Sequence, residues 1–245
     1  MAFPLVGSGP GIFMPNSGVL PEFKDVFPYS DFVHWYETVH IPDWLRWKPG
    51  AITTAWRYQS LDADRDWPFL VAYKFPNISD LSSPDYVTIP LTNPMLPEGG
   101  PISKFTHIEA VAGPHIETWR SGSTGDDRGP ILVTEEIDPA NITVDKFQEW
   151  YRDVYIGEVS AMAGWRRTSR FDNGMGQPRW LALHEFEESG FGPNTTKIAG
   201  LLGKSNETQE IQRAASKIYV GLWKLMRVYG DGSAPWGLPG EDKII

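Results

Sequence analysis

The segment FVHWYETVHIPDWL, residues 32 to 45, has the spacing of an amphipathic helix. Its main side chains recur at i, i+3, i+4, i+7, i+8 and i+11, which places them on one face of an α-helix: Phe32, Trp35, Tyr36, Val39, His40 and Asp43. At about 100° per residue, His34 points away from this face, whereas His40 lies at its edge. The spacing therefore predicts a helix that packs three aromatic rings against a core and brings His40 toward it.

The same skeleton returns 115 residues later (147 − 32) in FQEWYRDVYIGEV, residues 147 to 159. The shift matches six positions: Phe32 with Phe147, Trp35 with Trp150, Tyr36 with Tyr151, Val39 with Val154, Ile41 with Ile156, and Asp43 with Glu158. The second copy keeps the apolar face, but Tyr155 replaces His40 and Glu149 replaces His34. Similarity at a fixed shift indicates that the chain is built from two related halves.

Apolar runs bounded by glycine and proline flank both copies at matching places, and such runs are typical of strands. The pairs of runs are 9–14 with 128–136, 52–58 with 165–171, 67–75 with 178–186, and 115–120 with 218–229. A further helix with about two turns on either side of Gly203 is predicted within 194–217. Each half then has the order βαββαβ, which is the ferredoxin-like unit. We therefore predict an α+β fold of two tandem ferredoxin-like units whose free sheet faces bury each other.

The predicted boundary between the halves lies in SGSTGDDRG, residues 121 to 129, whose Gly, Ser and Asp content is typical of a linker. The predicted domains are residues 1–121, which carry the motif at 32–42, and residues 122–245, in which the motif is degenerate. A second irregular stretch, residues 82–101, is long for a loop without structure. Loops of that length are often lids or binding loops, and disorder is the alternative.

Composition excludes several classes of protein. The net charge of −9 without any basic block argues against a nucleic-acid partner. The absence of cysteine excludes disulfides, thiolate nucleophiles and cysteine-ligated metal centres. The first residues lack the charged n-region of a signal peptide, and no run reaches membrane-spanning length. We expect a cytoplasmic protein without a membrane partner.

Phe32, the aromatic pair at 35 and 36, His40 and Pro42 resemble the F-x-x-aromatic-aromatic-x-x-x-H-x-P signature of EthD-like proteins. These belong to the dimeric α+β barrel superfamily, and the resemblance extends to the strand order of both halves. It differs in placing tryptophan before tyrosine, and the second half has Tyr155 and Gly157 instead of histidine and proline. The resemblance implies an intramolecular dimeric α+β barrel, as a monomeric pseudo-dimer or a homodimer, often without metal or organic cofactor.

Relatives in that superfamily include polyketide cyclases, aromatic-acid decarboxylases, lactone isomerases, cofactor-independent oxygenases and some haem enzymes, so the fold alone does not select a reaction. His40 is the main catalytic candidate, because imidazole titrates near neutrality and can take and return a proton. Asp43 could orient the ring, and Tyr36, one turn earlier, could donate to a developing oxyanion. The structural alternative is that His40 only caps the helix end.

Six further residues are candidates for substrate binding: Trp35, Arg57, Tyr73, Tyr155, Arg170 and His184. Arg57 and Arg170 hold near-equivalent positions after the helices and could anchor a carboxylate or phenolate, although structural salt bridges are the alternative. His184 matches Tyr73 on a predicted strand, where both could line a cavity or be polar core residues. We expect these groups around one hydrophobic chamber shared by the halves, with His40 beside it.

The usual cofactor signals are incomplete. GSGPG, residues 7 to 11, lacks the strand-before, helix-after context of a dinucleotide loop, and GKS at Gly203 has Ile198 where a Walker motif needs glycine. His34 and His40 diverge, so we expect no metal site and no cofactor, with haem ligation by His40 or His184 as a remaining alternative.

The sequence favours a cofactor-independent lyase, isomerase or cyclase that transfers a proton on a hydrophobic aromatic polyketide or phenolic substrate. One alternative is a cofactor-independent oxygenase of an anthrone-like substrate. The other is a non-catalytic protein that binds an aromatic ligand.

Overall fold

The computed structural model describes residues 7–84, 88–174, 176, 178–192, 195–236 and 242–245. Within them, eight antiparallel strands close into a barrel in the order β1-β3-β2-β8-β5-β7-β6-β4, and β4 pairs back with β1. The strands are β1 (Gly11–Val19), β2 (Thr54–Ser60), β3 (Phe69–Phe75), β4 (Thr106–Arg120), β5 (Ile131–Asp138), β6 (Trp165–Asp172), β7 (Trp180–Phe186) and β8 (Lys217–Gly230). A short strand, β9 (Lys243–Ile244), pairs parallel with β4.

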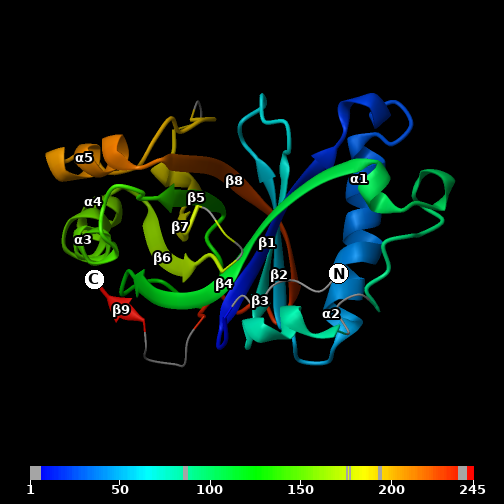
Figure 1. Cartoon of the computed structure of the whole chain (residues 1–245), viewed down its shortest axis with the longest axis horizontal. Helices are drawn as coiled ribbons and strands as arrows, with labels where there is room; N and C mark the ends of the chain where they lie inside the picture. Colours follow the sequence, from blue (N-terminus) through cyan, green and yellow to red (C-terminus); the bar gives the residue numbers. More distant parts are fainter. Residues whose placement is uncertain (1–6, 85–87, 175, 177, 193–194, 237–241) are drawn as a thin grey trace.

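Two long strands join the halves of the barrel. β4 pairs with β1 through residues 106–114 and then with β6 through residues 115–120. β8 pairs with β5 through residues 217–224 and with β2 through residues 223–230. In Figure 1, β4 runs from the side of α1 to the side of α3. The segments predicted as closing strands, residues 115–120 and 218–229, lie within these two long strands, and each long strand pairs with strands of both groups.

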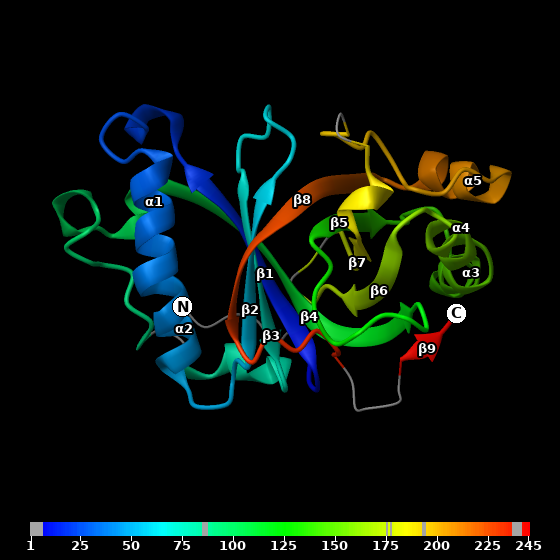
Figure 2. The same ribbon diagram turned by 180° about the vertical axis from the view of Figure 1, so that it is seen from behind.

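Helices cover the barrel on two opposite sides (Figures 1 and 2). One side carries a continuous rod of α1 (Tyr29–Trp35), the π-helical turn η2 (Tyr36–His40) and α2 (Ile41–Trp47). The other carries α3 (Val144–Trp150), the π-helical turn η7 (Tyr151–Tyr155), α4 (Ile156–Ser160) and α5 (Asn206–Ala214). Short 3₁₀ turns occupy Pro21–Phe23, Ile78–Ser82, Pro97–Gly99, Ile102–Lys104 and Glu188–Gly190. Within the described residues, none of the helices is long and apolar enough to cross a bilayer.

The π turn η2 corrects the predicted helical face. A π turn closes hydrogen bonds from i to i+5 and so takes up one residue more than an α turn. The buried stripe therefore slips by one position after Tyr36, and it consists of Phe32, Trp35, Tyr36, His40, Ile41 and Trp44. Val39 and Asp43, which an ideal α-helix would place on that face, are partly exposed. The second copy has its π turn at the equivalent residues, 151 to 155.

The second helix of each half departs from prediction. In the first half, the described residues between β3 and β4 form only 3₁₀ turns and loops. In the second half, α5 begins at Asn206, and the described residues 195–205 before it are not helical. Gly203 explains part of this, because a Cβ there would lie 2.8 Å from Cε2 of Tyr155. The chain must pass this close to α4 and η7 before a helix can begin.

The interior of the barrel is packed with side chains rather than hollow along its length. Its apolar cluster combines residues from both halves: Ile12, Met14, Trp56, Tyr58, Leu70, Ala72, Leu132, Phe171, Leu181, Leu183, Trp223, Ala234 and Trp236. The free faces of the two groups of strands thus bury each other, as predicted. Two further clusters lie outside the barrel, each between the strands and the helices of one side. We call them the first layer, under α1–η2–α2, and the second layer, under α3–η7–α4 and α5.

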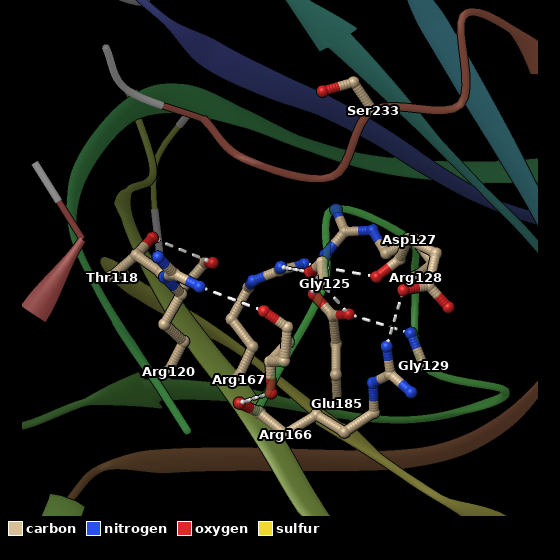
Figure 3. A network of polar contacts seen from close by, with 12 residues as sticks. Thr118, Arg120, Gly125, Asp127, Arg128, Gly129, Arg166, Arg167, Glu185 and Ser233 are labelled. Carbon is tan, nitrogen blue, oxygen red and sulfur yellow. Dashed lines mark hydrogen bonds and ion pairs between the residues drawn. The ribbon is translucent and has the colours of Figure 1, made fainter. Parts of the chain in front are cut away.

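One end of the barrel is closed by buried charges (Figure 3). Arg128 and Arg167 both bond to the carboxylate of Glu185, and the backbone N–H of Gly129 donates to the same group at 2.9 Å. The Arg128 guanidinium also lies 4.1 Å from the ring centre of Trp56. The predicted linker at residues 121–129 is therefore packed against the barrel, with Arg128 only 5% exposed.

Candidate functional site

His40 lies in the first layer, at the last residue of η2. The ring is stacked on Trp35 at 4.8 Å and on Tyr36 at 5.2 Å between ring centres. Trp44, one turn further along α2, donates from Nε1 to Nε2 of His40 at 3.0 Å. The opposite ring nitrogen, Nδ1, is buried and has no hydrogen-bond partner among the described residues. The aromatic cage thus contains this unpaired atom and a second one among the described residues, the buried Nε1 of Trp35.

The protonation state of His40 follows from these contacts. Burial lowers the pKa of its imidazole from 6.5 to about 4, so the ring is neutral at pH 7. The indole N–H of Trp44 can only donate, so Nε2 must be the bare nitrogen. The single ring proton therefore sits on Nδ1, and the unpaired atom is a hydrogen-bond donor. In this arrangement His40 is prepared to donate to an oxygen rather than to accept a proton through Nδ1.

Two of the predicted partners of His40 are engaged elsewhere. Asp43 points away from the ring because of the extra residue in η2, and its carboxylate contacts Arg46 at 3.3 Å instead. Arg57 is 5% exposed and forms an ion pair with Glu37, which also accepts from Arg227 at 2.8 Å. The expectation that Asp43 orients the imidazole is therefore wrong. Arg57 forms a structural salt bridge, which was the alternative to binding a substrate.

Tyr36 and Tyr73 lie in the first layer with His40, as expected. Tyr36 is 3% exposed and stacks on Phe32 at 5.1 Å as well as on His40. Tyr73 on β3 is fully buried and stacks on Trp44 at 5.0 Å. His40 thus contacts aromatic rings of its own helix, and one of them, Trp44, in turn stacks on Tyr73 of the sheet.

The second layer holds a chain of hydrogen bonds centred on a carboxylate. His184 Nε2 lies 3.0 Å from Oε2 of Glu135, and Tyr155 donates to Oε1 of the same group at 2.5 Å. Thr168 Oγ1 lies 2.9 Å from His184 Nδ1 and accepts from Trp165 Nε1 at 3.0 Å. Burial, and then the charge of Glu135, raise the pKa of Tyr155 well above its usual value. Both ring nitrogens of His184 therefore have partners, unlike those of His40.

Arg170 also lies in the second layer, in a separate cluster of charges. It donates from Nη1 to Glu117 at 2.7 Å, and its guanidinium lies 3.8 Å from the ring centre of Tyr151. Arg152 and Lys243 bind the same carboxylate at 3.1 and 2.6 Å. Burial would raise the pKa of Glu117, but these hydrogen bonds and the charge of Arg170 bring it below the usual value. Arg170, like Arg57, is occupied by a buried ion pair.

The predicted site residues do not meet around one shared chamber. Trp35, Tyr36, His40, Arg57 and Tyr73 belong to the first side of the barrel. Three others, Tyr155, Arg170 and His184, belong to the second side, beyond the packed interior. The ninth, Asp43, is partly exposed on α2 and contacts Arg46. His40 lies on the outer face of its strands, so the expectation that it borders the space between the halves is wrong.

Sequence reasoning missed Glu135 and Thr168, which complete the second layer. Glu135 lies between Thr134 and Glu136 in a strand, and alternation alone leaves open which carboxylate faces inward. A signal was nevertheless present. A fully buried glutamate needs partners, and His184 on the neighbouring strand was a candidate for one. In the described part of the chain, no group of three or more His, Asp or Glu side chains is arranged to hold a metal ion.

No family model matches this chain. It is 21% identical over 224 residues to core atranone cluster protein 1 of Stachybotrys chlorohalonatus, with 84% of this chain and 86% of that protein covered. Among solved structures it is similar to an anthrone oxidase-like protein, with a TM-score of 0.56 and 11% identity over 94% of this chain and 96% of that one. It is also similar to a chlorite dismutase variant from Candidatus Nitrospira defluvii, with a TM-score of 0.52 and 12% identity over 90% and 93% of the two chains. These likenesses and the closed eight-stranded barrel show that the chain shares the α+β barrel fold of these structures.

Proposed function

We propose that this chain is an enzyme that acts on a small, hydrophobic, oxygen-bearing aromatic substrate, a polyketide or a phenolic compound, at His40 in the first layer. The observation that carries the proposal is the buried Nδ1–H of His40, which has no partner among the described residues. Leaving a buried donor unpaired costs about 1–3 kcal/mol, so such groups need an explanation. A substrate oxygen would supply the missing acceptor, and the surrounding aromatic rings suit a flat apolar ligand.

The chemistry follows from a neutral imidazole that donates. A donor held in an apolar cage stabilises negative charge as it develops on a carbonyl or phenol oxygen while a proton passes from the adjacent carbon to a water molecule that enters with the substrate. Tyr36, stacked on His40, is the second candidate donor to that oxygen. Cyclisation, isomerisation and decarboxylation of aromatic polyketides all pass through such an anion. This role replaces proton abstraction by His40 assisted by Asp43.

An oxygenase is the second candidate, and the comparisons support it. One structural neighbour bears the name anthrone oxidase-like protein, and the relative from Stachybotrys is a protein of the atranone cluster. The same carbanion, once stabilised by His40, could react with O₂ without a cofactor if the substrate is anthrone-like. Oxygen consumption in step with product formation distinguishes this reaction from proton transfer alone.

The duplicated architecture belongs to the same proposal. We propose two ferredoxin-like units, residues 1–121 and 122–245, that form an EthD-like pseudo-dimer within one chain. The strand orders β4-β1-β3-β2 and β8-β5-β7-β6 support this division, since each is fourth-first-third-second within its half. The matching π turns at residues 36–40 and 151–155 support it as well. Only the first unit then carries a histidine at the end of its turn.

The test compares three variants with the wild-type protein, using 1,8-dihydroxyanthrone and a hydroxynaphthoic acid as probe substrates. Product formation is followed by liquid chromatography, and oxygen by an electrode. His40→Ala should lower turnover on the order of a hundredfold. His40→Asn, whose amide N–H replaces Nδ1–H, should recover part of that loss. His34→Ala, on the exposed face of the same helix, is the matched control and should retain full turnover.

Two results would contradict the proposal. If His40→Ala turns over its substrate as fast as the wild type, the first layer is not the active site. If His40→Asn is as inactive as His40→Ala while both remain folded, the donor role of Nδ1 is wrong and a proton-accepting role returns.

A further inference from the structure

A cavity lies inside the barrel, at the end opposite the Arg128–Glu185–Arg167 cluster. It has a volume of about 370 Å³, within the range of about 300–1,000 Å³ that is usual for small-molecule sites. Met14, Leu70 and Trp223 form part of its apolar wall, and Asn16, Arg65 and Glu136 supply polar groups. Its walls come from both halves of the chain, through β1, β3, β5 and β8. This cavity is distinct from the first layer, which lies on the outer face of the strands.

Two of the three polar groups leave hydrogen-bonding capacity unused. Asn16 Oδ1 and Arg65 Nε are buried and without hydrogen-bond partners in the described part of the chain. The Arg65 guanidinium lies 4.4 Å from the ring centre of Trp223, which fixes it at the cavity wall. Glu136 faces the same space from β5, opposite Leu181 and Tyr219 of the flanking strands. An acceptor, a donor and a carboxyl group are therefore directed at one enclosure.

These groups define the chemistry of a matching ligand. Its body must be apolar, because it would contact Met14, Leu70 and Trp223. It must carry a hydroxyl that donates to Glu136 or to Asn16, and a second oxygen that accepts from Arg65 Nε. We infer that the barrel mouth is a second small-molecule site, which binds an uncharged ring compound bearing a hydroxyl and a carbonyl, with Glu136 as acceptor for the hydroxyl. The site does not depend on the function proposed for His40.

Protonation of Glu136 makes this binding sensitive to pH. Burial raises the pKa of Glu136 to about 7, an effect that Arg65 opposes and Glu109 reinforces. The titratable or charged side chains that share its cavity are Arg65, Glu109 and Tyr219. Glu136 is the stronger hydrogen-bond acceptor when it is ionised, because its oxygens then carry negative charge. Affinity for a neutral hydroxyl compound should therefore rise between pH 6 and pH 7.5.

The experiment uses the full chain carrying His40→Ala, so that the hydrogen-bond donor of the first layer is removed. The probe is 6-hydroxy-1-tetralone, and its methyl ether, 6-methoxy-1-tetralone, is the control that cannot donate. Isothermal titration calorimetry measures affinity at pH 6 and 7.5. Nuclear Overhauser effects between the probe and the Met14 methyl group locate the bound molecule.

We expect the probe to bind 1:1 and its methyl ether to bind at least tenfold more weakly. The affinity of the probe should rise between pH 6 and pH 7.5. Glu136→Gln should remove the pH dependence and weaken binding about tenfold, and Met14→Phe should fill the cavity and abolish binding. Glu109→Gln, at the exposed rim, should change affinity little. If Met14→Phe does not fold, the location of the probe is decided by its nuclear Overhauser effects to the Met14 methyl group, measured in the protein with an unaltered cavity. The inference is overturned if the probe does not bind, if it shows no contact with Met14, or if Glu136→Gln leaves affinity and pH dependence unchanged.

Discussion

The two helix-covered layers share one skeleton and differ in how their polar groups are paired. In the first layer His40 stacks on Trp35 at 4.8 Å, and in the second Tyr155 stacks on Trp150 at 4.7 Å, both at the end of a π turn. Tyr155 bonds to Glu135, while His40 has an unpaired donor among the described residues. The same backbone thus supports a completed hydrogen-bond chain on one side and an incomplete one on the other.

The difference teaches which layer carries stability and which is prepared for a ligand. A buried carboxylate with all its partners in place is a structural element that resists substitution. A buried donor without a partner is a local cost that folded proteins keep mainly where function uses it. The register of the strands shows where the two layers differ. Phe13 lies opposite Tyr73 in the first layer, and Val133 lies opposite His184 in the second. Two residues further along β1 and β5, the first layer therefore has Pro15 where the second has Glu135.

The largest expected effect concerns Glu135. Glu135→Ala leaves His184, Tyr155 and the backbone N–H of Leu202 without their shared acceptor. We expect the free energy of unfolding to fall by about 3–5 kcal/mol, measured by urea denaturation at pH 7. Glu136→Ala is the matched control on the opposite face of the same strand, and it should cost far less. Equal losses in the two variants would remove the distinction between the layers.

The next effect is a pH dependence that belongs to the first layer alone. His40 has a pKa of about 4 when folded and about 6.5 when unfolded. Between these values the unfolded chain binds a proton that the folded chain does not, so stability falls as the pH drops from 6.5 to 4. The fall attributable to His40 amounts to about 3 kcal/mol at most. His40→Asn should lose less stability over this range than the wild type, in denaturation curves collected at each pH. If the stability of the two proteins falls equally with pH, burial does not lower the pKa of the His40 imidazole.

The smallest effect tests whether the pairing of a buried hydroxyl matters. Tyr155→Phe removes the donor to Glu135, and we expect a loss of about 1–3 kcal/mol in the free energy of unfolding. Tyr58→Phe is the control, because Tyr58 is also fully buried but its hydroxyl has no hydrogen-bond partner in the described part of the chain. Because a buried hydroxyl without a partner is itself unfavourable, that change should be neutral or stabilising. If Tyr58→Phe is the more damaging substitution, hydrogen-bond pairing is not what distinguishes the second layer.

Much of the fold was predictable from local patterns. The strands were marked by apolar runs between turn residues, and the aromatic helix by its spacing, because both signals come from neighbours along the chain. The π turn was not predictable in this way, since an α-helical template leaves Asp43 beside His40 and only the inserted residue turns it toward Arg46. The second helix of the first half was predicted as part of the βαββαβ order, and the described residues form only 3₁₀ turns and loops there.

The candidate site was predictable in part. His40 was identified because an imidazole beside an aromatic stripe is chemically conspicuous, and its burial agrees with that stripe. Its hydrogen bond with Trp44, four residues further along the chain, was not predicted. The grouping of residues from both halves into one chamber was wrong for a topological reason. Alternate residues of a strand face opposite sides, so Tyr73 and His184 point outward into separate layers.

The shared long strands have a consequence for how the protein is made. β2 completes its pairing only with the C-terminal part of β8, where Thr54 lies opposite Gly230. During synthesis, β2 therefore emerges long before its neighbour exists, and its open edge can pair with other chains. Closure over so many intervening residues is also slow, because the entropy of a very long loop must be lost before the contact forms. Expression at low temperature or with chaperones that shield strand edges should favour the correctly closed molecule over aggregates.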